Sequence, residues 1–156
     1  MAETTRGPDQ ESKEGNGAVT HVVVLLPGIM GSVLELGNEV VWPGSVGNLL
    51  WSEYKQMDKL LKPELKATDV IRSFSISEQY GSLIRDLGTC GFHEAGPKPT
   101  LFVCPYDWRK DNALAAGVLA DKVDAAVAMH GADTEVSIVA HSMGGLVARC
   151  PPCQYR

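Results

Sequence analysis

The sequence predicts an α/β domain in which helices flank a mainly parallel sheet. Short apolar runs rich in valine, isoleucine and leucine alternate with longer segments whose apolar residues recur at helical spacing. Loops rich in glycine or proline follow three of these runs, after Leu26, after Cys104 and at Ser142. Ligands bind beyond the carboxyl ends of the strands in such sheets, so these three loops are the expected site.

The composition is that of one soluble globular domain. Of the 156 residues, 44% are hydrophobic and 21% are charged, and the formal net charge of −5 argues against a nucleic-acid partner. No apolar run approaches the roughly 18 residues of a membrane span, and the first residues lack the apolar core of a signal peptide, so we expect a cytoplasmic protein. Residues 1–18 are polar and glycine-rich, which predicts a disordered leader.

The first predicted strand is Val19–Leu26, an almost continuous apolar run typical of a buried, central, parallel strand. The loop Pro27–Ser32 follows it, and a turn is expected at Gly37. Residues Ser45–Leu61 carry apolar side chains at three- and four-residue spacing, which predicts a helix that ends before Pro63. This helix either packs on the core or forms a lid or lipid-facing cap.

The middle of the chain is predicted to contain a short strand at Val70–Ile76 and then a helix. Ser75 and Glu78 fit a capping box for a helix over about Ile76–Leu87, with Gly88 as its C-cap. The residues expected to face inward from this helix are Tyr80, Leu83, Ile84 and Leu87.

Another strand and helix precede Ser142. Thr100–Cys104 is predicted as the strand because it is short and apolar. Asn112–Met129 is rich in alanine and is predicted as a helix that Gly131 ends. The apolar residues expected on one side of it are Leu114, Val118, Val123 and Val127.

The stretch from Val136 to Arg149 predicts a strand, a sharp turn and a helix, with Ser142 at the apex of the turn. It matches a nucleophile elbow, written here as Ala-His-Ser-Met-Gly. Ala140 and Gly144 must be small because the residues two before and two after the serine are expected to pass close together. The alternative is an ordinary glycine-rich turn that carries a serine.

A serine nucleophile also needs N–H groups that stabilise the oxyanion of its intermediate. The N–H of Met143 follows the serine at the start of a helix, where backbone N–H groups are unpaired. The loop Pro27–Gly31 offers the N–H of Ile29 or Met30, and its glycines let the backbone approach a substrate closely. Alternatively, this loop is an ordinary turn.

Three motifs occur together: Pro-Gly-Ile-Met-Gly-Ser, Pro-Tyr-Asp-Trp-Arg and Ala-His-Ser-Met-Gly-Gly. Their order and spacing resemble the lecithin:cholesterol acyltransferase-like family of α/β-hydrolases over about residues 19–149. The resemblance implies an acyl-enzyme on Ser142, with the backbone N–H groups of Ile29 and Met143 as the oxyanion hole. It implies a lipid ester as acyl donor, an alcohol or water as acceptor, and no cofactor or metal. It also raises the prospect that Trp42–Leu61 contacts a membrane or lipid surface.

Asp107, Trp108 and Arg109 precede the serine, whereas the acid of the triad follows it in this fold. We therefore expect a structural role for them. An Asp–Arg ion pair and a buried indole would hold the loops beside the site.

The base and the acid of a catalytic triad are missing from this sequence, because no Asp, Glu or His follows Ser142. The four histidines come before it. We expect His141 to point away from Ser142, His21 to lie in a strand and His130 to end a helix, which leaves His93 as a marginal substitute. The chain is therefore expected to be nearly inert as a hydrolase. A general esterase or lipase and a non-catalytic lipid-binding fragment remain the alternatives.

These observations predict that residues 19–149 are the N-terminal part of an α/β-hydrolase domain, truncated after the elbow strand and the start of its helix. Residues 150–156 are unlike the family, and a truncated or frameshifted reading frame would explain them. A redox or zinc site at Cys150 and Cys153 is a weaker interpretation, because two cysteines supply only half of the usual zinc ligands.

Overall fold

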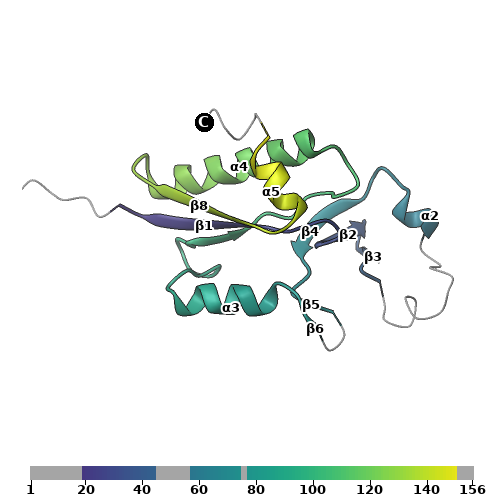
Figure 1. The fold of residues 1–156 in the computed structure, drawn as a ribbon, viewed down its shortest axis with the longest axis horizontal. Coiled ribbons are helices and arrows are strands. Elements are labelled where there is room, and N and C mark those ends of the chain that lie inside the picture. Colours follow the sequence, from purple (N-terminus) through teal and green to yellow (C-terminus); the bar gives the residue numbers. More distant parts are fainter. Residues whose placement is uncertain (1–18, 45–56, 75–76, 151–156) are drawn as a thin grey trace, which may run out of the picture.

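A computed structural model of the chain describes residues 19–44, 57–74 and 77–150, which form two three-stranded sheets, a short hairpin and flanking helices (Figure 1). The strands are β1 (His21–Leu26), β2 (Ser32–Leu36), β3 (Glu39–Trp42), β4 (Lys66–Val70), β5 (Ser73–Phe74), β6 (Ser77–Glu78), β7 (Leu101–Val103) and β8 (Glu135–Ala140). The helices are α2 (Met57–Leu60), α3 (Gly81–Thr89), α4 (Asn112–His130) and α5 (Met143–Ala148). The predicted mixture of helices and a parallel sheet is confirmed.

β1 is the central strand of a parallel sheet with the order β7-β1-β8. It pairs with β8 along its whole length, from His21 opposite Glu135 to Leu26 opposite Ala140. The prediction of a central, parallel first strand is therefore confirmed. The register also brings the carboxyl ends of β1 and β8 side by side, so the loops that follow Leu26 and Ala140 start next to each other.

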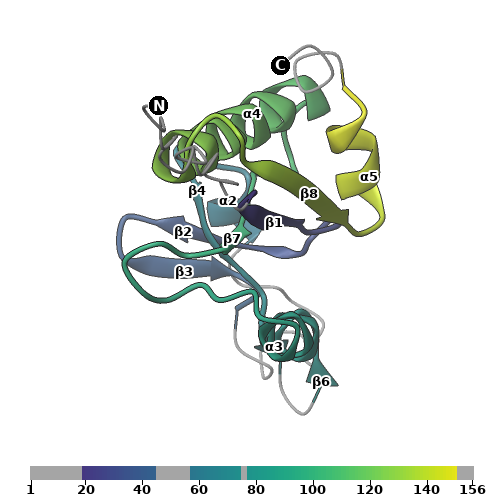
Figure 2. The same ribbon diagram turned by 90° about the vertical axis from the view of Figure 1, so that its left-hand side faces the viewer.

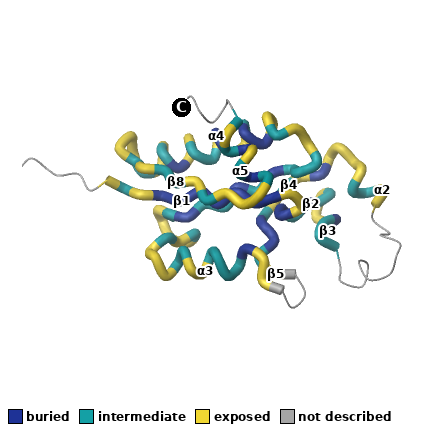
Figure 3. Tube along the Cα trace, viewed as in Figure 1, coloured by how far each residue is buried: buried dark blue, intermediate teal, exposed yellow. Residues whose placement is uncertain are grey.

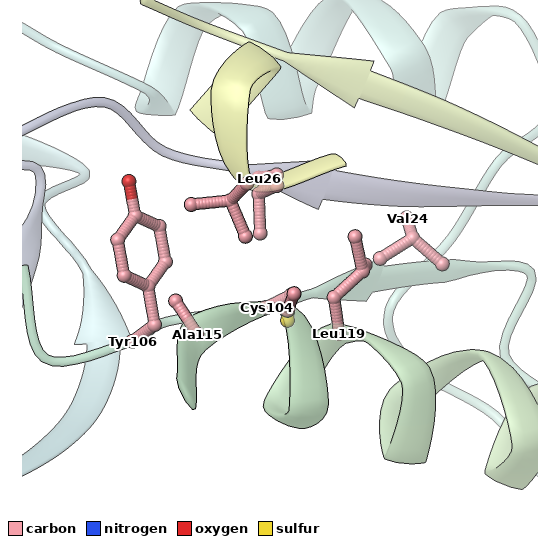
Figure 4. Close-up of a cluster of buried hydrophobic side chains, with 8 residues drawn as sticks. Val24, Leu26, Cys104, Tyr106, Ala115 and Leu119 are labelled. Atoms are coloured by element: carbon pink, nitrogen blue, oxygen red, sulfur yellow. The ribbon is translucent and has the colours of Figure 1, made fainter. Parts of the chain in front are cut away.

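Helices cover both faces of this sheet (Figure 2). Val24 and Leu26 pack toward α4 and α5, in a cluster shown in Figure 4 that includes Ala116, Leu119 and Val147. Val23 and Leu25 point to the other face, where they pack toward α3 and its residues Leu83, Ile84 and Leu87. The strand is buried from both sides (Figure 3), which explains why its sequence is continuously apolar. The inward face expected for the α3 segment is confirmed.

The second sheet is antiparallel and has the order β3-β2-β4. β2 and β3 form a hairpin whose turn contains Gly37 with a φ of 62°, as the sequence predicted. Leu34, Val41 and Leu65 form the buried core between this sheet and the neighbouring loops. β4 was not predicted. Its burial alternates along Lys66–Val70, but Lys66 and Asp69 among its five residues hide the apolar signal.

The capping box expected at Ser75 and Glu78 is wrong. Glu78 lies in β6, which pairs with β5, and α3 begins only at Gly81, with Tyr80 as an N-cap that makes no side-chain cap. The N–H groups of Gln79 and Gly81 both donate to the Arg72 carbonyl. The chain is therefore still in a hairpin where the first helical turn was expected. Ser75 and Ile76 lie outside the described residues.

Two boundaries in the same region also differ from the prediction. The strand expected at Val70–Ile76 is replaced by β4, which ends at Val70, and by the short β5. The helix continues past the expected C-cap Gly88 to Thr89, and the glycine with a positive φ, 93°, is Gly91. A glycine in the left-handed region just beyond the last helical residue is a common helix stop signal. Here that glycine is Gly91, three residues after the predicted Gly88.

α4 confirms the long alanine-rich helix but only part of its predicted apolar side, since Val123 packs against the core. The Asp111 side chain accepts a hydrogen bond from the Ala113 N–H at 2.8 Å at its start, and Gly131 ends it with a φ of 111°. Leu114 and Val118 are exposed, whereas the buried face is made of Ala115, Ala116, Leu119, Ala120 and Ala126. The small side chains face the sheet because they let the helix backbone approach it closely.

The helix expected at Ser45–Leu61 is described only at its end, where α2 covers Met57–Leu60. Residues 45–56 lie outside the described part of the chain, so the choice between a core helix and a lid stays open. Met57 and Leu61 are exposed, Leu61 by 76%. In the ranges that the structure describes, none of the helices has both the length and the apolar character that crossing a bilayer needs.

Candidate active site

The turn that joins β8 to α5, residues 140–144, is called the Ser142 turn below. Ser142 stands at its apex with φ 51° and ψ −122°. A non-glycine residue in such a region is strained by roughly 1–3 kcal/mol. Ser142 is exposed, and α5 starts directly after it. The predicted strand, sharp turn and helix are confirmed.

Gly144 lies against the end of β1. A Cβ atom there would lie 2.6 Å from the Pro27 carbonyl oxygen and 2.9 Å from the Leu26 carbonyl oxygen. The sequence predicts a small residue here because positions 140 and 144 are expected to pass close together. The nearest atoms in the structure belong to residues 26 and 27, because α5 begins directly on the backbone of the neighbouring strand.

Residues 27–31 follow β1 and are called the Pro27 loop below. The Gly31 N–H donates to the Gly28 carbonyl at 3.0 Å, and Met30 has a φ of 60°. Within the described residues, no acceptor pairs with the backbone N–H of Ile29 or of Met143. Both N–H groups can therefore donate to an external oxygen atom.

The Pro27 loop touches the Ser142 turn directly. A Cβ atom on Gly28 would lie 3.0 Å from Ser142 Cβ and 3.0 Å from His141 Nδ1. At that spacing the neighbours would have to move, so Gly28 is needed for the close approach of the two loops. The backbone of the Pro27 loop and the serine are thus adjacent, as the sequence predicted for the ends of two parallel strands.

Two buried tyrosines bind the start of the Pro27 loop. The Tyr106 hydroxyl donates to the Pro27 carbonyl at 2.9 Å, and the Gly28 N–H donates to the Tyr80 hydroxyl oxygen at 2.8 Å. Figure 4 shows Tyr106 beside Leu26, at the end of β1. The Tyr80 hydroxyl also lies 2.9 Å from His141 Nδ1. His141 therefore has a partner other than the serine.

Neither tyrosine hydroxyl is predicted from the sequence. The helical spacing predicts Tyr80 only as an inward residue, and no pattern gives Tyr106 a role. One signal was present: a tyrosine on an apolar face needs a hydrogen-bond partner for its hydroxyl when it is buried. The partners are backbone groups far away in sequence, and only the fold brings them together.

A cavity of about 290 Å³ opens beside the Pro27 loop. Its lining combines apolar and polar side chains, among them Ile29, Met30, Trp42, Ile71, Tyr80 and His141. The Trp42 indole N–H donates to the Met30 carbonyl at 2.9 Å, which ties β3 to the loop. The volume is close to the lower end of the range for small-molecule pockets.

Asp107, Trp108 and Arg109 hold loops together, as the sequence predicted. The Arg109 guanidinium binds the Asp107 carboxylate through Nε at 2.8 Å and through Nη2 at 2.6 Å, and its Nη1 donates to the Lys62 carbonyl at 2.8 Å. It also donates to the Leu60 carbonyl at the end of α2. Trp108 packs edge-on against Trp42, with ring centroids 5.7 Å apart.

The ion pair controls the ionisation of Asp107. Burial by itself would raise the pKa of this carboxyl. The hydrogen bonds from the Arg109 side chain and N–H, followed by the charges of Arg109 and Lys110, outweigh that effect and lower the pKa below its ordinary value. Asp107 is thus held as a carboxylate in a structural contact.

No described side chain accepts a hydrogen bond from the Ser142 hydroxyl. Three histidines have other partners: His141 contacts Tyr80, His21 Nε2 lies 2.7 Å from Ser137 Oγ, and His130 Nε2 lies 2.8 Å from the Pro99 carbonyl. The described residues therefore bring the serine and candidate oxyanion donors together without a base. Cys150 is a free, half-buried thiol, and Cys153 lies outside the described residues.

A comparison with curated proteins found no match. A comparison with family models, in contrast, agrees with the resemblance that the three motifs indicate. The family model for lecithin:cholesterol acyltransferase matches residues 19–150, which include both loops and most of the chain. The chain therefore belongs to the lecithin:cholesterol acyltransferase family.

Proposed function

We propose that this chain carries the nucleophile of a lipid acyl-transfer reaction, and that Ser142 is that nucleophile. The observation that carries the proposal is the strained backbone of Ser142, whose φ is 51° at the junction of β8 and α5. That conformation presents the hydroxyl at the carboxyl edge of the sheet, where α/β enzymes bind their substrates. On this interpretation residues 19–149 are the N-terminal part of an α/β-hydrolase-type domain.

The proposed chemistry begins with attack of Ser142 Oγ on the carbonyl carbon of an ester. The carbonyl oxygen becomes an oxyanion, which the N–H groups of Ile29 and Met143 would stabilise. The alcohol leaves with a proton, and the acyl group remains on Ser142 until another alcohol or water takes it. The serine proton must pass to a base. No described residue supplies one, so we expect the chain alone to be nearly inert.

A lipid ester is the proposed substrate. Family membership supports this class, and the cavity beside the Pro27 loop supports it with apolar walls that include Ile29, Met30, Trp42 and Ile71. We also propose that Trp42–Leu61 contacts a lipid surface. The exposed side chains of Met57 and Leu61, at the described end of that segment, support this role.

A second candidate is lipid binding without catalysis. It is supported by the same cavity together with the absence of a base among the described residues. A general esterase or lipase differs from the leading proposal only in the acceptor, because the Ser142 turn does not distinguish water from another alcohol.

A fluorophosphonate probe tests the nucleophile. We expect slow labelling of the folded chain at Ser142, and no labelling of Ser142→Ala, which keeps the turn but removes the hydroxyl. Absence of labelling in the folded wild-type chain, with binding of a fluorescent lipid ester retained, would establish the binding-only function.

A p-nitrophenyl ester tests the missing base. Loss of a base lowers turnover by about 10⁶ and leaves about 10³–10⁴ over water. We therefore expect no burst of p-nitrophenol from the chain alone. A stoichiometric burst that Ser142→Ala abolishes would show that the chain contains a working base after all.

A further inference from the structure

One peptide group at the start of the Pro27 loop is held at both of its polar atoms. Its carbonyl oxygen, from Pro27, accepts from the Tyr106 hydroxyl at 2.9 Å. Its N–H, from Gly28, donates to the Tyr80 hydroxyl at 2.8 Å. Tyr106 is 2% exposed and Tyr80 is 8% exposed. Water therefore competes little for either hydrogen bond.

The two tyrosines reach this peptide group from opposite sides of the sheet. Tyr106 belongs to the cluster between the sheet and α4, and Tyr80 belongs to the cluster between the sheet and α3. A peptide plane fixed at its oxygen and at its hydrogen cannot rotate without breaking one of these bonds. The Ile29 N–H belongs to the next peptide group, whose Gly28 carbonyl accepts from the Gly31 N–H at 3.0 Å. The clamped plane and this turn bond together restrict the direction of the Ile29 N–H.

Tyr80 differs from Tyr106 because it reaches the Ser142 turn as well. Its hydroxyl oxygen accepts from Gly28 and lies 2.9 Å from His141 Nδ1. A hydroxyl that accepts from the Gly28 N–H can still donate, and His141 Nδ1 is the acceptor within its reach among the described residues. Donation to Nδ1 would place the ring proton of His141 on Nε2.

We propose that Tyr80 is a positioning residue that couples the Pro27 loop to the Ser142 turn. One hydroxyl fixes the peptide group before Ile29 and the ring of the residue before Ser142. The coupling itself follows from the hydrogen bonds, and its effect on acyl transfer rests on the proposed function of Ser142 and Ile29. Tyr106 anchors the same peptide group to the core, but its described hydrogen bonds go to Pro27 and Ser32 and none reaches the Ser142 turn.

The test compares Tyr80→Phe with the matched control Tyr106→Phe in the full 156-residue chain. Each variant removes one buried hydroxyl from the same peptide group, but only the first removes the partner of His141. Two readouts are needed. Long-range ¹H–¹⁵N spectra report which ring nitrogen of His141 carries the proton, with His141→Gln used to assign the signal. The rate of Ser142 labelling by a fluorophosphonate reports how reactive the Ser142 hydroxyl is.

We expect His141 to be the Nε2–H tautomer in the wild type and in Tyr106→Phe, and to become a mixture of tautomers in Tyr80→Phe. Labelling of Ser142 should slow about tenfold in Tyr80→Phe, the effect of one lost hydrogen bond, and less in the control.

Three results would overturn the proposal. The wild-type spectrum decides it even if Tyr80→Phe does not fold, because an Nδ1–H tautomer contradicts the inferred bond. Equal tautomer changes in both tyrosine variants would show a general loss of packing instead of coupling. An unchanged labelling rate in Tyr80→Phe would remove the positioning role. If wild-type Ser142 is not labelled at all, the proposed function fails, and the tautomer readout still decides whether Tyr80 couples the loops.

Discussion

The antiparallel sheet is inserted in the chain between β1 and β7 of the parallel sheet, and different forces stabilise the two sheets. All of β1 except His21 is buried between α3 and α4, and backbone hydrogen bonds fix both of its ends. The β3-β2-β4 sheet has a smaller core, and polar side chains attach the neighbouring α2 segment. Arg109 reaches the carbonyls at the end of α2, and Lys59 pairs with Glu39 on the surface.

The same difference distinguishes two parts of the candidate site, the Ser142 turn and the Trp42 side of the cavity. The Ser142 turn depends on close backbone packing against β1, which tolerates almost no added volume. The Trp42 side of the cavity depends on hydrogen bonds and an ion pair, which respond to pH and to substitution of single polar groups. Packing therefore sets the position of the serine, and electrostatics help to set the position of the opposite wall.

The largest effect is expected where packing is closest. In Gly144→Val the new side chain must occupy the space of the Pro27 and Leu26 carbonyls, 2.6 and 2.9 Å from its Cβ. Since backbone cannot yield as a side chain does, we expect the free energy of unfolding to fall by more than about 3 kcal/mol. Urea denaturation measures it.

Gly145→Ala is the matched control for Gly144→Val. Gly145 is also in α5, and nothing lies within 4 Å of a Cβ built there. Alanine is the better helix former, so we expect a gain of about 0.5–1 kcal/mol. Similar losses in both variants would contradict the claim that contact with β1, and not helix propensity, requires Gly144.

Breaking the Asp107–Arg109 pair should have the next largest effect. The two side chains are 9% and 17% exposed, and Asp107→Asn leaves the guanidinium without its charge partner. We expect a loss of about 2–3 kcal/mol at pH 7. The exposed pair gives the control, because Glu39→Gln should change stability by less than about 0.5 kcal/mol.

The pH dependence of Asp107 has a definite sign. Because the pKa of the folded carboxyl is lowered, its stabilising effect is fully present above the ordinary value of about 3.9 and is lost as pH falls through the folded value. The stability difference between wild type and Asp107→Asn should therefore shrink below about pH 4. Hydrogen exchange at Leu61 and Lys62 should rise at the same time. A stability difference between the two chains that stays constant down to pH 2 would show that ionised Asp107 is not the source of the stabilisation.

The smallest of these effects concerns Tyr106 at alkaline pH. Burial, followed by the influence of Tyr80 and Cys104, raises the pKa of Tyr106 to about 12. The folded state thus favours the neutral phenol, and its stabilising effect is present below about pH 10 and is lost as pH rises toward 12. We expect a loss of about 2 kcal/mol over this window that Tyr106→Phe does not show. If the free energy of unfolding falls with pH equally in the wild type and in Tyr106→Phe, Tyr106 does not ionise in this pH range.

The sequence predicts the elements of the parallel part well because each of them carries its own local signal. The apolar run at Val19–Leu26, the Asp111 and Gly131 ends of α4, and the glycines around Ser142 each determine their own backbone. The motifs also identified the family, since Pro-Tyr-Asp-Trp-Arg and the two glycine-rich loops occur in a distinctive order.

The errors lie where long-range contacts override local signals. Glu78 fits a capping box, but pairing of β6 with β5 uses the backbone there. Leu114 and Val118 look like a core face, but the face of α4 that packs on the sheet is the one with Ala116 and Leu119. The hydrogen bond between Tyr80 and Gly28 spans 52 positions and the one between Tyr106 and Pro27 spans 79, so neither has a signal in local spacing.

The strained backbone of Ser142 means that serine is not the residue that stability alone would favour at this position. A glycine at this position would adopt φ 51° without the steric cost that serine bears, so it would make the chain easier to fold. Mutation toward stability alone would therefore replace the serine. Folding disfavours a serine at this strained position, and its presence there supports the chemistry proposed for its hydroxyl.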